Sequence, residues 1–324
     1  MHRLAYILSA SHSGSTLLAM VLGAQPGVCT AGELKLTHLG NPDRYRCSCK
    51  ALIRDCAFWN AVKTAMAARG IADFELARAA TSIYEVDGSC ARRLLAPLVR
   101  GPFWETLRDA GLALAPRWRA YLKESQRRNA ALVGSLQEIT GARIVVDSSK
   151  LALRLKYLLK NPDLDIKVIR LIRDGRAVAM TYTDEWMFAD AADPALRGGG
   201  CGQRRASARS NMTDAANEWK RSNESADCLV DRLPAAQWIR VRYEDFCRDP
   251  KQVLTRLCEF LGLDSNHINL DFRAPQQHVV GNGMRLDESS KIKLDERWKE
   301  HLSKADLAAF DQVAGELNRK YGYN

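Results

Sequence analysis

The stretch that decides the fold is Ile7-Leu8-Ser9-Ala10-Ser11-His12-Ser13-Gly14-Ser15-Thr16-Leu17-Leu18. An apolar segment ends at Leu8 and is followed by small and hydroxylated residues, and then by an apolar periodic segment that stops before Gly23 and Pro26. This pattern predicts a β-strand, a tight turn and the start of a helix. Free backbone N–H groups and the helix dipole favour anions at such a helix start.

The residues of this turn have the chemistry of a phosphate site. Ser13, Ser15 and Thr16 carry hydroxyl donors, and Gly14 lets the backbone approach a phosphate closely. The segment is not a Walker A motif, because the basic residue, His12, precedes the small residues instead of following them. We therefore expect a nucleotide-type anion that is not ATP with Mg²⁺ held in the usual way. A plain tight turn is the alternative.

The composition indicates a globular protein with anionic ligands. A chain of 324 residues with 46% hydrophobic residues can bury a large core. The net charge of +10 favours anions in general, although no nucleic-acid-binding signature is present. No apolar run approaches the roughly 20 residues of a membrane span, and no cleavable signal pattern is present. We expect a soluble cytoplasmic protein without stable membrane insertion.

Predicted strands and helices alternate along most of the chain. The strands are predicted at residues 3–9, 143–147, 166–172 and 238–243, and the helices at 57–140 (most of that segment), 151–159, 252–261 and 304–320. The second and third strands enclose a helix and so form a β–α–β unit with a parallel sheet and a right-handed crossover. We expect one α/β domain over residues 1–324, a P-loop-like parallel sheet flanked by helices, with a helical insertion at about 57–140.

Polar residues follow the predicted strands, where the ligands of parallel sheets bind. The second strand leads into Asp147-Ser148-Ser149-Lys150, the third into Arg173-Asp174-Gly175-Arg176, and the fourth into Tyr243-Glu244-Asp245. Together with the turn after the first strand, these ends bring cations and hydroxyl donors to one edge of the sheet. A solvated loop is the alternative at each of them.

Two of these segments together resemble the sulfotransferases that use 3′-phosphoadenosine 5′-phosphosulfate (PAPS). Residues 11–18 are similar to the family's 5′-phosphosulfate loop, which has Lys or Arg before S-G-[ST]-[ST]. Residues 168–178 are similar to its 3′-phosphate segment, R-D-[PG]-R-A, and residues 241–250 to a third recurrent stretch. The order of the segments matches over the whole chain. The bacterial carbohydrate and small-molecule enzymes and the tyrosylprotein sulfotransferases are the most similar branches.

The resemblance implies sulfuryl transfer from PAPS to a hydroxyl of a carbohydrate or small-molecule acceptor, without a metal. It assigns the 3′-phosphate to Arg173 and Thr181, and it implies a basic loop that closes over the adenosine. Arg176 is a second phosphate contact or, as we favour, a salt-bridge partner of Asp174. The full predicted cofactor-binding set is His12, Ser13, Gly14, Ser15, Thr16, Arg173, Thr181, Tyr243, Arg285 and Lys291.

Three residues are candidates for catalysis. His12 stands where the family has a Lys or Arg that stabilises the leaving oxygen, and the anionic cofactor would favour its protonated form. If His12 only fixes the loop, Lys150 can supply the cation, because the resemblance implies a catalytic lysine near this strand end. The resemblance to the tyrosylprotein and some bacterial sulfotransferases also implies a catalytic glutamate at about the place of Glu33, which lies 21 positions after His12 and is the candidate general base. A capping or salt-bridging role is the alternative for Glu33, and His38 and Asp147 are weaker candidates for the base.

Three of the nine cysteines, Cys47, Cys49 and Cys56, are clustered. With a fourth ligand such as His38 they could hold Zn²⁺, but the spacing matches no common zinc module. A redox-labile pair and simple packing are the other interpretations, and we favour packing. We accordingly predict no metal.

Two other functions remain as alternatives. A nucleotide-dependent kinase would share the turn and the β–α–β layout, but it needs a carboxylate for Mg²⁺, and Asp147 is the only fair candidate. A non-catalytic sulfotransferase-like binding protein would also fit the charge. Residues 195–211, rich in arginine and glycine, are predicted to form a mobile loop that covers the site or contacts the acceptor.

Overall fold

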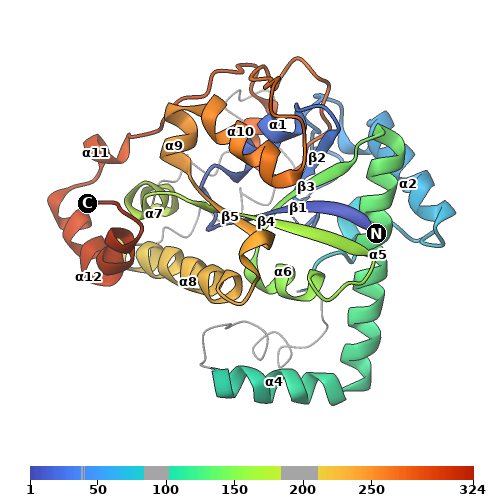
Figure 1. Cartoon of the computed structure of the whole chain (residues 1–324), viewed down its shortest axis with the longest axis horizontal. Helices are drawn as coiled ribbons and strands as arrows, with labels where there is room; N and C mark the ends of the chain where they lie inside the picture. The colour runs from blue at the N-terminus through green and yellow to red at the C-terminus, as the bar shows by residue number, and fades with distance from the viewer. Residues whose placement is uncertain (38, 40, 84–101, 184–210) are drawn as a thin grey trace.

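The computed structural model describes residues 1–37, 39, 41–83, 102–183 and 211–324. Figure 1 shows a central β-sheet with helices on both of its faces. This arrangement confirms the predicted α/β fold class. His38, residues 84–101 of the predicted insertion and residues 195–210 of the predicted loop lie outside the described residues.

The sheet has five parallel strands in the order β2-β3-β1-β4-β5. Their bounds are β1 (His2–Leu8), β2 (Val28–Gly32), β3 (Ile144–Lys150), β4 (Leu164–Ile172) and β5 (Trp238–Arg242). The sequence predicts four of these strands and misses β2, an edge strand of only five residues that includes Ala31 and Gly32. It also ends β3 too early, because the polar residues after Val146 still pair with β1 and β2.

The side chains of β1 alternate between the two faces, as the pleat of a strand requires. Leu4, Tyr6 and Leu8 belong to one hydrophobic cluster, whereas Ala5 and Ile7 belong to another. Because helices cover both faces, the strand is apolar throughout its buried length instead of alternating with polar residues. This explains why the first strand is so easy to predict from the sequence.

Two groups of helices cover the sheet (Figure 1). One face carries α1 (Ser15–Gly23), α9 (Tyr243–Arg248) and α10 (Pro250–Leu261). The other carries α2 (Ala57–Ala68), α5 (Pro116–Thr140), α6 (Ala152–Leu158) and part of α8 (Met212–Val230). A third cluster joins α7 (Gly175–Thr183), α8 and α12 (Lys304–Lys320). The short helices are η1 (Ile53–Asp55), η2 (Leu76–Arg78), η6 (Ala235–Gln237), η7 (Gly283–Leu286) and α11 (Trp298–His301).

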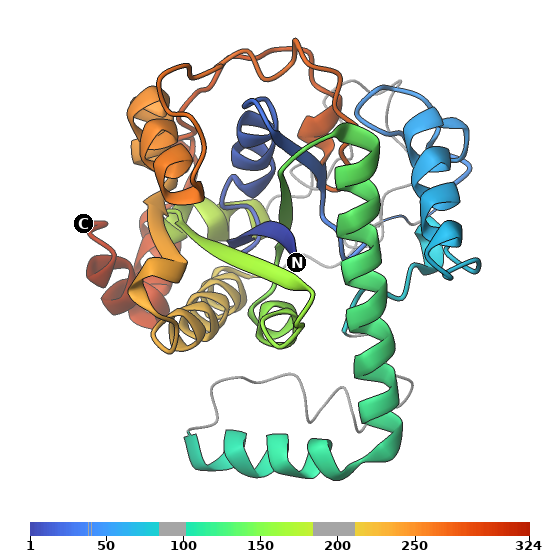
Figure 2. The same cartoon turned by 45° about the vertical axis from the view of Figure 1, so that its right-hand side comes forward.

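The predicted helical insertion is helical in α2, α4 (Pro102–Leu114) and α5 among its described residues. Figure 2 shows α4 extending away from the sheet at the lower end of α5. Pro116 begins α5 at a position where its missing N–H costs nothing, and Gly141 ends it with φ 67°. No helix in the described ranges is both long and apolar enough to span a bilayer.

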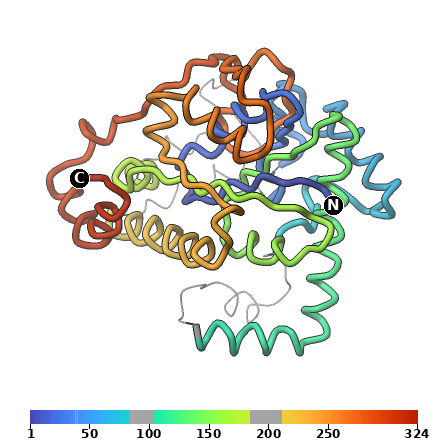
Figure 3. Tube along the Cα trace, viewed as in Figure 1, coloured from blue at the N-terminus to red at the C-terminus, as the bar shows by residue number. Residues whose placement is uncertain are grey.

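The segment that follows α10 returns to the N-terminal part of the sheet (Figure 3). An isolated parallel β-bridge joins Gly32, the last residue of β2, to Val280. Gly32 has φ +85°, and a Cβ atom there would lie 2.0 Å from the carbonyl oxygen of Val280. Only glycine therefore allows this close approach.

We expect Gly32→Ala to lower the free energy of unfolding by about 1–3 kcal/mol from backbone strain, with a further loss from the clash. Urea denaturation of the purified variant measures this change. Gly111→Ala is the matched control, because Gly111 is exposed in α4 and its added Cβ would meet nothing within 4 Å. It should be neutral or stabilising by up to about 1 kcal/mol. Equal losses in the two variants would contradict the argument.

Candidate active site

The carboxyl ends of the five strands bring the predicted site residues to one edge of the sheet. The turn at residues 9–14 follows β1, Glu33 follows β2, Lys150 ends β3, Arg173 follows β4, and Tyr243 follows β5. This edge is where parallel sheets place their ligands. Residues that lie far apart in the chain thus become neighbours through strand order alone.

The turn at residues 9–14, between β1 and α1, has the backbone geometry of an anion-binding site, and we call it the anion turn. Gly14 is the N-cap of α1 with φ 85°, and no side chain caps the helix. The first N–H groups of the helix are therefore available to a ligand. Ser13, Ser15 and Thr16 are buried in this turn. The Ser13 hydroxyl has no hydrogen-bond partner within the described chain, which is what a site shaped for a further acceptor would show.

Tyr243 packs directly against this turn. A Cβ atom at Gly14 would lie 2.4 Å from Cδ2 of the tyrosine ring, so the ring and the turn fit only because position 14 is glycine. The Tyr243 hydroxyl donates to the carbonyl of Lys293 at 3.3 Å. Burial raises the pKa of this phenol, so Tyr243 stays neutral at physiological pH.

Arg173 connects the two predicted phosphate segments. Its Nη1 donates to the carbonyl oxygen of His12 at 2.9 Å, across 161 residues of sequence. Its guanidinium carbon lies 4.5 Å from the centroid of the Tyr243 ring, and its Nη2 donates to Oδ2 of Asp295 at 3.0 Å. The turn after β1 and the segment after β4 therefore share one arginine.

Asp295 is a member of this group that the sequence analysis missed. Desolvation opposes its ionisation, but hydrogen bonds from Arg297 and the charge and hydrogen bond of Arg173 outweigh that cost and hold its pKa well below the usual range. Its carboxylate therefore stays charged and orients the Arg173 guanidinium. The run Asp295-Glu296-Arg297 carries no pattern that distinguishes it from a solvated loop.

The side chains of Arg176 and Thr181, which follow Arg173, form contacts within the protein. Arg176 forms the predicted salt bridge with Asp174, at 2.8 Å, and its guanidinium carbon lies 4.2 Å from the ring centroid of Trp298. The Thr181 hydroxyl donates to the carbonyl of Ala177 at 3.1 Å, within α7. A phosphate contact of Thr181 thus remains a prediction, and such a contact would require the hydroxyl to turn away from the Ala177 carbonyl and donate its proton to the phosphate.

Glu33 lies buried between two lysines. Nζ of Lys150 donates to its Oε1, and Nζ of Lys35 lies 3.1 Å from its Oε2. The three residues are 3%, 8% and 6% exposed in the order Glu33, Lys150, Lys35, so the pairing is shielded from water. Burial lowers the pKa of Lys35, although the charge of Glu33 acts in the opposite direction. The structure brings together two predicted catalytic residues, Glu33 and Lys150, and adds Lys35.

Lys35 is the main residue of this cluster that sequence reasoning missed. The signal was a single lysine inside the apolar stretch Leu34-Lys35-Leu36, two positions after the candidate base. A charge in such a stretch is either exposed or paired in the interior. In the structure the Lys35 side chain is buried. Its backbone is held beside β3, because the Lys35 N–H donates to Ser149 Oγ at 3.0 Å.

Asp147 lies next to this cluster, and both of its carboxylate oxygens accept hydrogen bonds. Its Oδ1 accepts from the N–H groups of Leu34 at 3.2 Å and Ser149 at 2.8 Å, and its Oδ2 accepts from Nη2 of Arg154 at 3.0 Å. The Asp147 carboxylate is 0% exposed. It is therefore a structural anchor. This bonding removes the support for Asp147 as a base or as the Mg²⁺ ligand of a kinase.

The predicted closing residues occupy two different places. Arg285 is fully buried and donates to the carbonyls of Arg46 at 2.9 Å and Gly281 at 2.8 Å, over the ring of Tyr45. It thus braces the segment beside Glu33. Lys291 is exposed. Closure of either residue over a nucleotide stays a prediction.

His12 adopts φ 61°, so its backbone turns sharply into the anion site. Its ring meets the ring of Tyr182 edge to face, with 5.0 Å between the centroids. The histidine therefore both orders the turn through its backbone and presents a ring at the start of the helix. Stabilisation of the leaving oxygen by His12 stays a prediction.

The buried lysine predicts a pH effect on stability. Because the pKa of Lys35 is lowered on folding, the unfolded chain binds more protons than the folded chain between the two pKa values. The free energy of unfolding contributed by Lys35 therefore rises with pH. We expect the stability difference between the wild type and Lys35→Met to shift in favour of the wild type from about pH 7 to about pH 10.

Urea denaturation over this pH range provides the measurement. Lys63→Met, which replaces an exposed lysine of α2, controls for the loss of a surface ion pair. A difference that stays constant, or that shifts in favour of Lys35→Met as the pH rises, would show that Lys35 is not held in the interior as described.

Comparisons with known proteins agree with this geometry. The family model described as "Sulfotransferase family" matches residues 5–267. No curated protein matches the chain. Among solved structures, the sulfotransferase domain of the olefin synthase of Synechococcus PCC 7002 is 19% identical with a TM-score of 0.50, over 100% of this chain and 95% of that one.

Two more solved structures are similar. The sulfotransferase domain from the curacin biosynthetic pathway is 18% identical, with a TM-score of 0.49 over 100% of this chain and 99% of that one. A sulfotransferase of Mycobacterium avium is 15% identical, with a TM-score of 0.46 over 100% and 78%. At its TM-score of 0.50 and 19% identity, the olefin synthase domain indicates a common fold alone. The family model, the strand order and the anion turn together identify the chain as an enzyme of the sulfotransferase family.

Proposed function

We propose that this enzyme transfers a sulfuryl group from PAPS to a hydroxyl of a carbohydrate or another small-molecule acceptor. The observation that carries the proposal is the hydrogen bond from Arg173 to the His12 carbonyl. This bond joins the two segments that we propose as anion-binding elements, at the carboxyl edge of one sheet. PAPS carries two separated anionic groups, a 5′-phosphosulfate and a 3′-phosphate, and so needs two such elements.

The residues at this edge fit the donor. The start of α1 offers uncapped N–H groups and the unpartnered Ser13 hydroxyl to the 5′ group. Arg173 is buried, its Nε has no partner within the described residues, and its planar guanidinium suits the 3′-phosphate. Asp295 holds Arg173 in position before any ligand arrives.

The chemistry requires positive charge where the leaving oxygen develops negative charge. PAPS, when bound, supplies the sulfuryl group and leaves as the 3′,5′-bisphosphate. A bond forms between the acceptor oxygen and sulfur while the bond between sulfur and the bridging oxygen breaks. Lys150 and His12 are the candidates that stabilise the bridging oxygen, and the edge of the sheet serves mainly to position the reacting groups in line.

Glu33 is our candidate for the base that takes the acceptor proton. It lies at the same edge as the anion turn, and it is bonded to Lys150 and Lys35. A carboxylate is the type of side chain that accepts a proton in such a step. Lys150 thereby lies between the candidate base and the donor site, because it contacts Glu33 and ends β3, which pairs with the strand before the anion turn.

The remaining assignments are extensions of this proposal. We infer a single catalytic domain over residues 1–324 in a cytoplasmic enzyme. The acceptor would bind beyond Glu33, against the described part of the helical insertion. No metal has a role in the proposed transfer.

Calorimetric titration with 3′-phosphoadenosine 5′-phosphate (PAP), the desulfated product, tests the donor site. We expect micromolar binding to the wild type and no comparable binding of ATP with Mg²⁺. Arg173→Ala should weaken PAP binding about 10- to 150-fold, because charge-assisted hydrogen bonds contribute about 1.5–3 kcal/mol.

Arg240→Ala is the matched control, since Arg240 is an exposed arginine of β5 and its removal changes the net charge equally. Its PAP affinity should stay at the wild-type value. Equal loss of PAP affinity in both variants would show that the effect of Arg173→Ala comes from net charge alone. Tighter binding of ATP than of PAP would instead support the kinase alternative.

Glu33→Gln tests catalysis separately from binding. The variant keeps the side-chain shape and can still accept from Lys150, so PAP affinity should change less than about threefold, whereas turnover should fall about 10²- to 10⁴-fold. PAP release from PAPS is measured with a panel of simple sugars and phenols as acceptors. Turnover at the wild-type rate would exclude Glu33 as the base. Loss of both binding and turnover would indicate a structural role, which the more conservative Glu33→Asp would then check.

A further inference from the structure

Two segments that are distant in sequence meet beside the active site. Cys47, Cys49 and Cys56 lie in the segment before α2, and His278 lies in the segment that follows α10. Their four ligand atoms all lie within 4.8 Å of one another. This cluster is outside the sulfuryl-transfer site described above.

The distances within the cluster fit a tetrahedral metal site. Nδ1 of His278 lies 3.4 Å from Sγ of Cys56 and 3.8 Å from Sγ of Cys47, and Sγ of Cys49 lies 3.7 Å from Sγ of Cys56. Zinc bonds of about 2.3 Å to sulfur and about 2.0 Å to nitrogen give tetrahedral edges of roughly 3.5–3.8 Å. Three of the six ligand pairs are thus already at about the separation that zinc needs, and all six lie within 4.8 Å.

We propose that Cys47, Cys49, Cys56 and His278 bind one Zn²⁺ in a closed, structural Cys₃His site. Three thiolates and one imidazole form a soft donor set that favours Zn²⁺ over Mg²⁺ or Ca²⁺. Four protein ligands leave no open position for a substrate or a reactive water. The proposal therefore concerns stability, and it does not depend on the proposed function.

The surroundings hold the ligands in place. The ring of His278 is stacked on the ring of Phe58, with 4.5 Å between the centroids and 5° between the planes. Ser48 is bonded to both neighbours of the histidine: its hydroxyl donates to the carbonyl of Gln277 and accepts from the N–H of Val279. Such fixed orientation of ligands is typical of metal centres.

The alternative uses of these cysteines explain less of the geometry. Each of Cys47, Cys49 and Cys56 is a free thiol. A disulfide would engage two of the sulfurs and leave the third, together with His278, without a reason to converge. Simple packing gives no reason for an imidazole nitrogen to face two thiols. The sequence suggested His38 as the fourth ligand, but His38 lies outside the described residues, and His278 takes that place.

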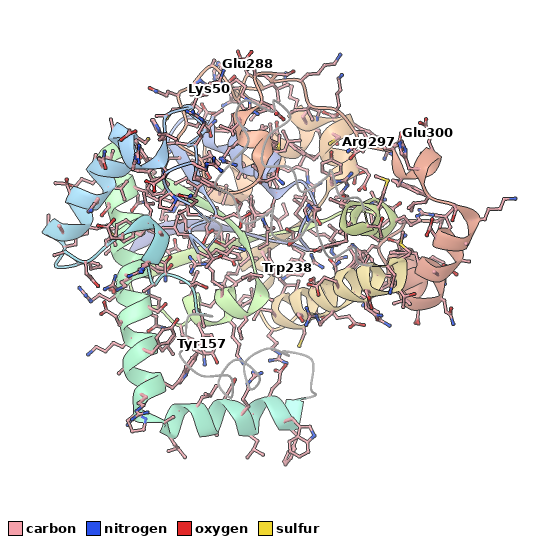
Figure 4. All side chains as sticks on the ribbon, turned by 180° about the vertical axis from the view of Figure 1, so that it is seen from behind. Lys50, Tyr157, Trp238, Glu288, Arg297 and Glu300 are labelled. Atoms are coloured by element: carbon pink, nitrogen blue, oxygen red, sulfur yellow. The ribbon has the colours of Figure 1, made fainter. Side chains whose placement is uncertain are left out.

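A metal at this cluster would join the segment before α2 to the residues that contact Glu33. The residues after His278 reach Glu33 directly: the Glu33 N–H donates to the Val280 carbonyl at 3.2 Å, and a Cβ atom at Gly281 would lie 3.1 Å from Cγ of Glu33. Figure 4 shows Lys50 and Glu288 side by side at the surface, where their ion pair also joins the two segments. The zinc would be a buried counterpart of this surface pair.

Elemental analysis of the reduced, tag-free protein from zinc-supplemented expression tests the proposal. We expect about one zinc per chain in the wild type and less than about 0.1 in Cys49→Ser and Cys56→Ser. Cys258→Ala, which replaces a buried cysteine of α10 outside the cluster, should keep the metal. Absence of zinc from the wild type, even after zinc is added to the reduced protein, would overturn the proposal, as would full retention in both serine variants.

A second measurement covers variants that fail to fold. The wild type is stripped with a chelator, and its melting temperature is compared before stripping, after stripping, and after addition of Zn²⁺ or Mg²⁺. We expect a lower melting temperature after stripping that only Zn²⁺ restores, and Co²⁺ should give the absorption bands of a tetrahedral thiolate site. An unchanged melting temperature together with no cobalt bands would contradict a structural site.

Discussion

The parallel pairing of β1 with β3 on one side and β4 on the other is the constraint on which the site depends. Because all the strands point the same way, their carboxyl ends meet, and each contributes its following residues to one edge. The register of β1 with β3 shifts between Tyr6 and Leu8, directly before the anion turn. Such irregularities redirect the chain next to functional sites. Arg173 and His12 can bond only because β4 pairs with β1.

The edge carries a group of buried charges that a protein interior normally avoids. Desolvation of ions costs several kcal/mol each and is offset only by close pairing and further hydrogen bonds. Glu33 obtains this pairing from Lys35 and Lys150, and Asp147 beneath them is bonded to Arg154 and to backbone N–H groups. The cluster therefore holds charge in a region of low polarity, where electrostatic interactions are strongest.

The segment after α10 contacts the site at two places. It covers β2 through the bridge of Gly32 with Val280, and further along it supplies Asp295 to Arg173. One segment thus contacts both the side of the site that holds Glu33 and the side that holds Arg173. A metal at His278 would fix this segment to the residues before α2, so that the stability of the C-terminal half would bear on the geometry around Glu33.

The sequence by itself determined the α/β class and four of the five strands, because these features rest on local periodicity and on short motifs. The motifs at residues 11–18 and 173–176 also supplied Arg173 as a candidate, and the family resemblance added Glu33 and Lys150. Apart from the salt bridge of Arg176 with Asp174, which the sequence predicted, the tertiary structure alone decided which charges are paired. Lys35, Asp295 and His278 reach their partners through strand order and through the return of the C-terminal segment, and no local pattern encodes those encounters. The short edge strand β2 was missed for the same reason, since its pairing with β3, more than its composition, makes it a strand.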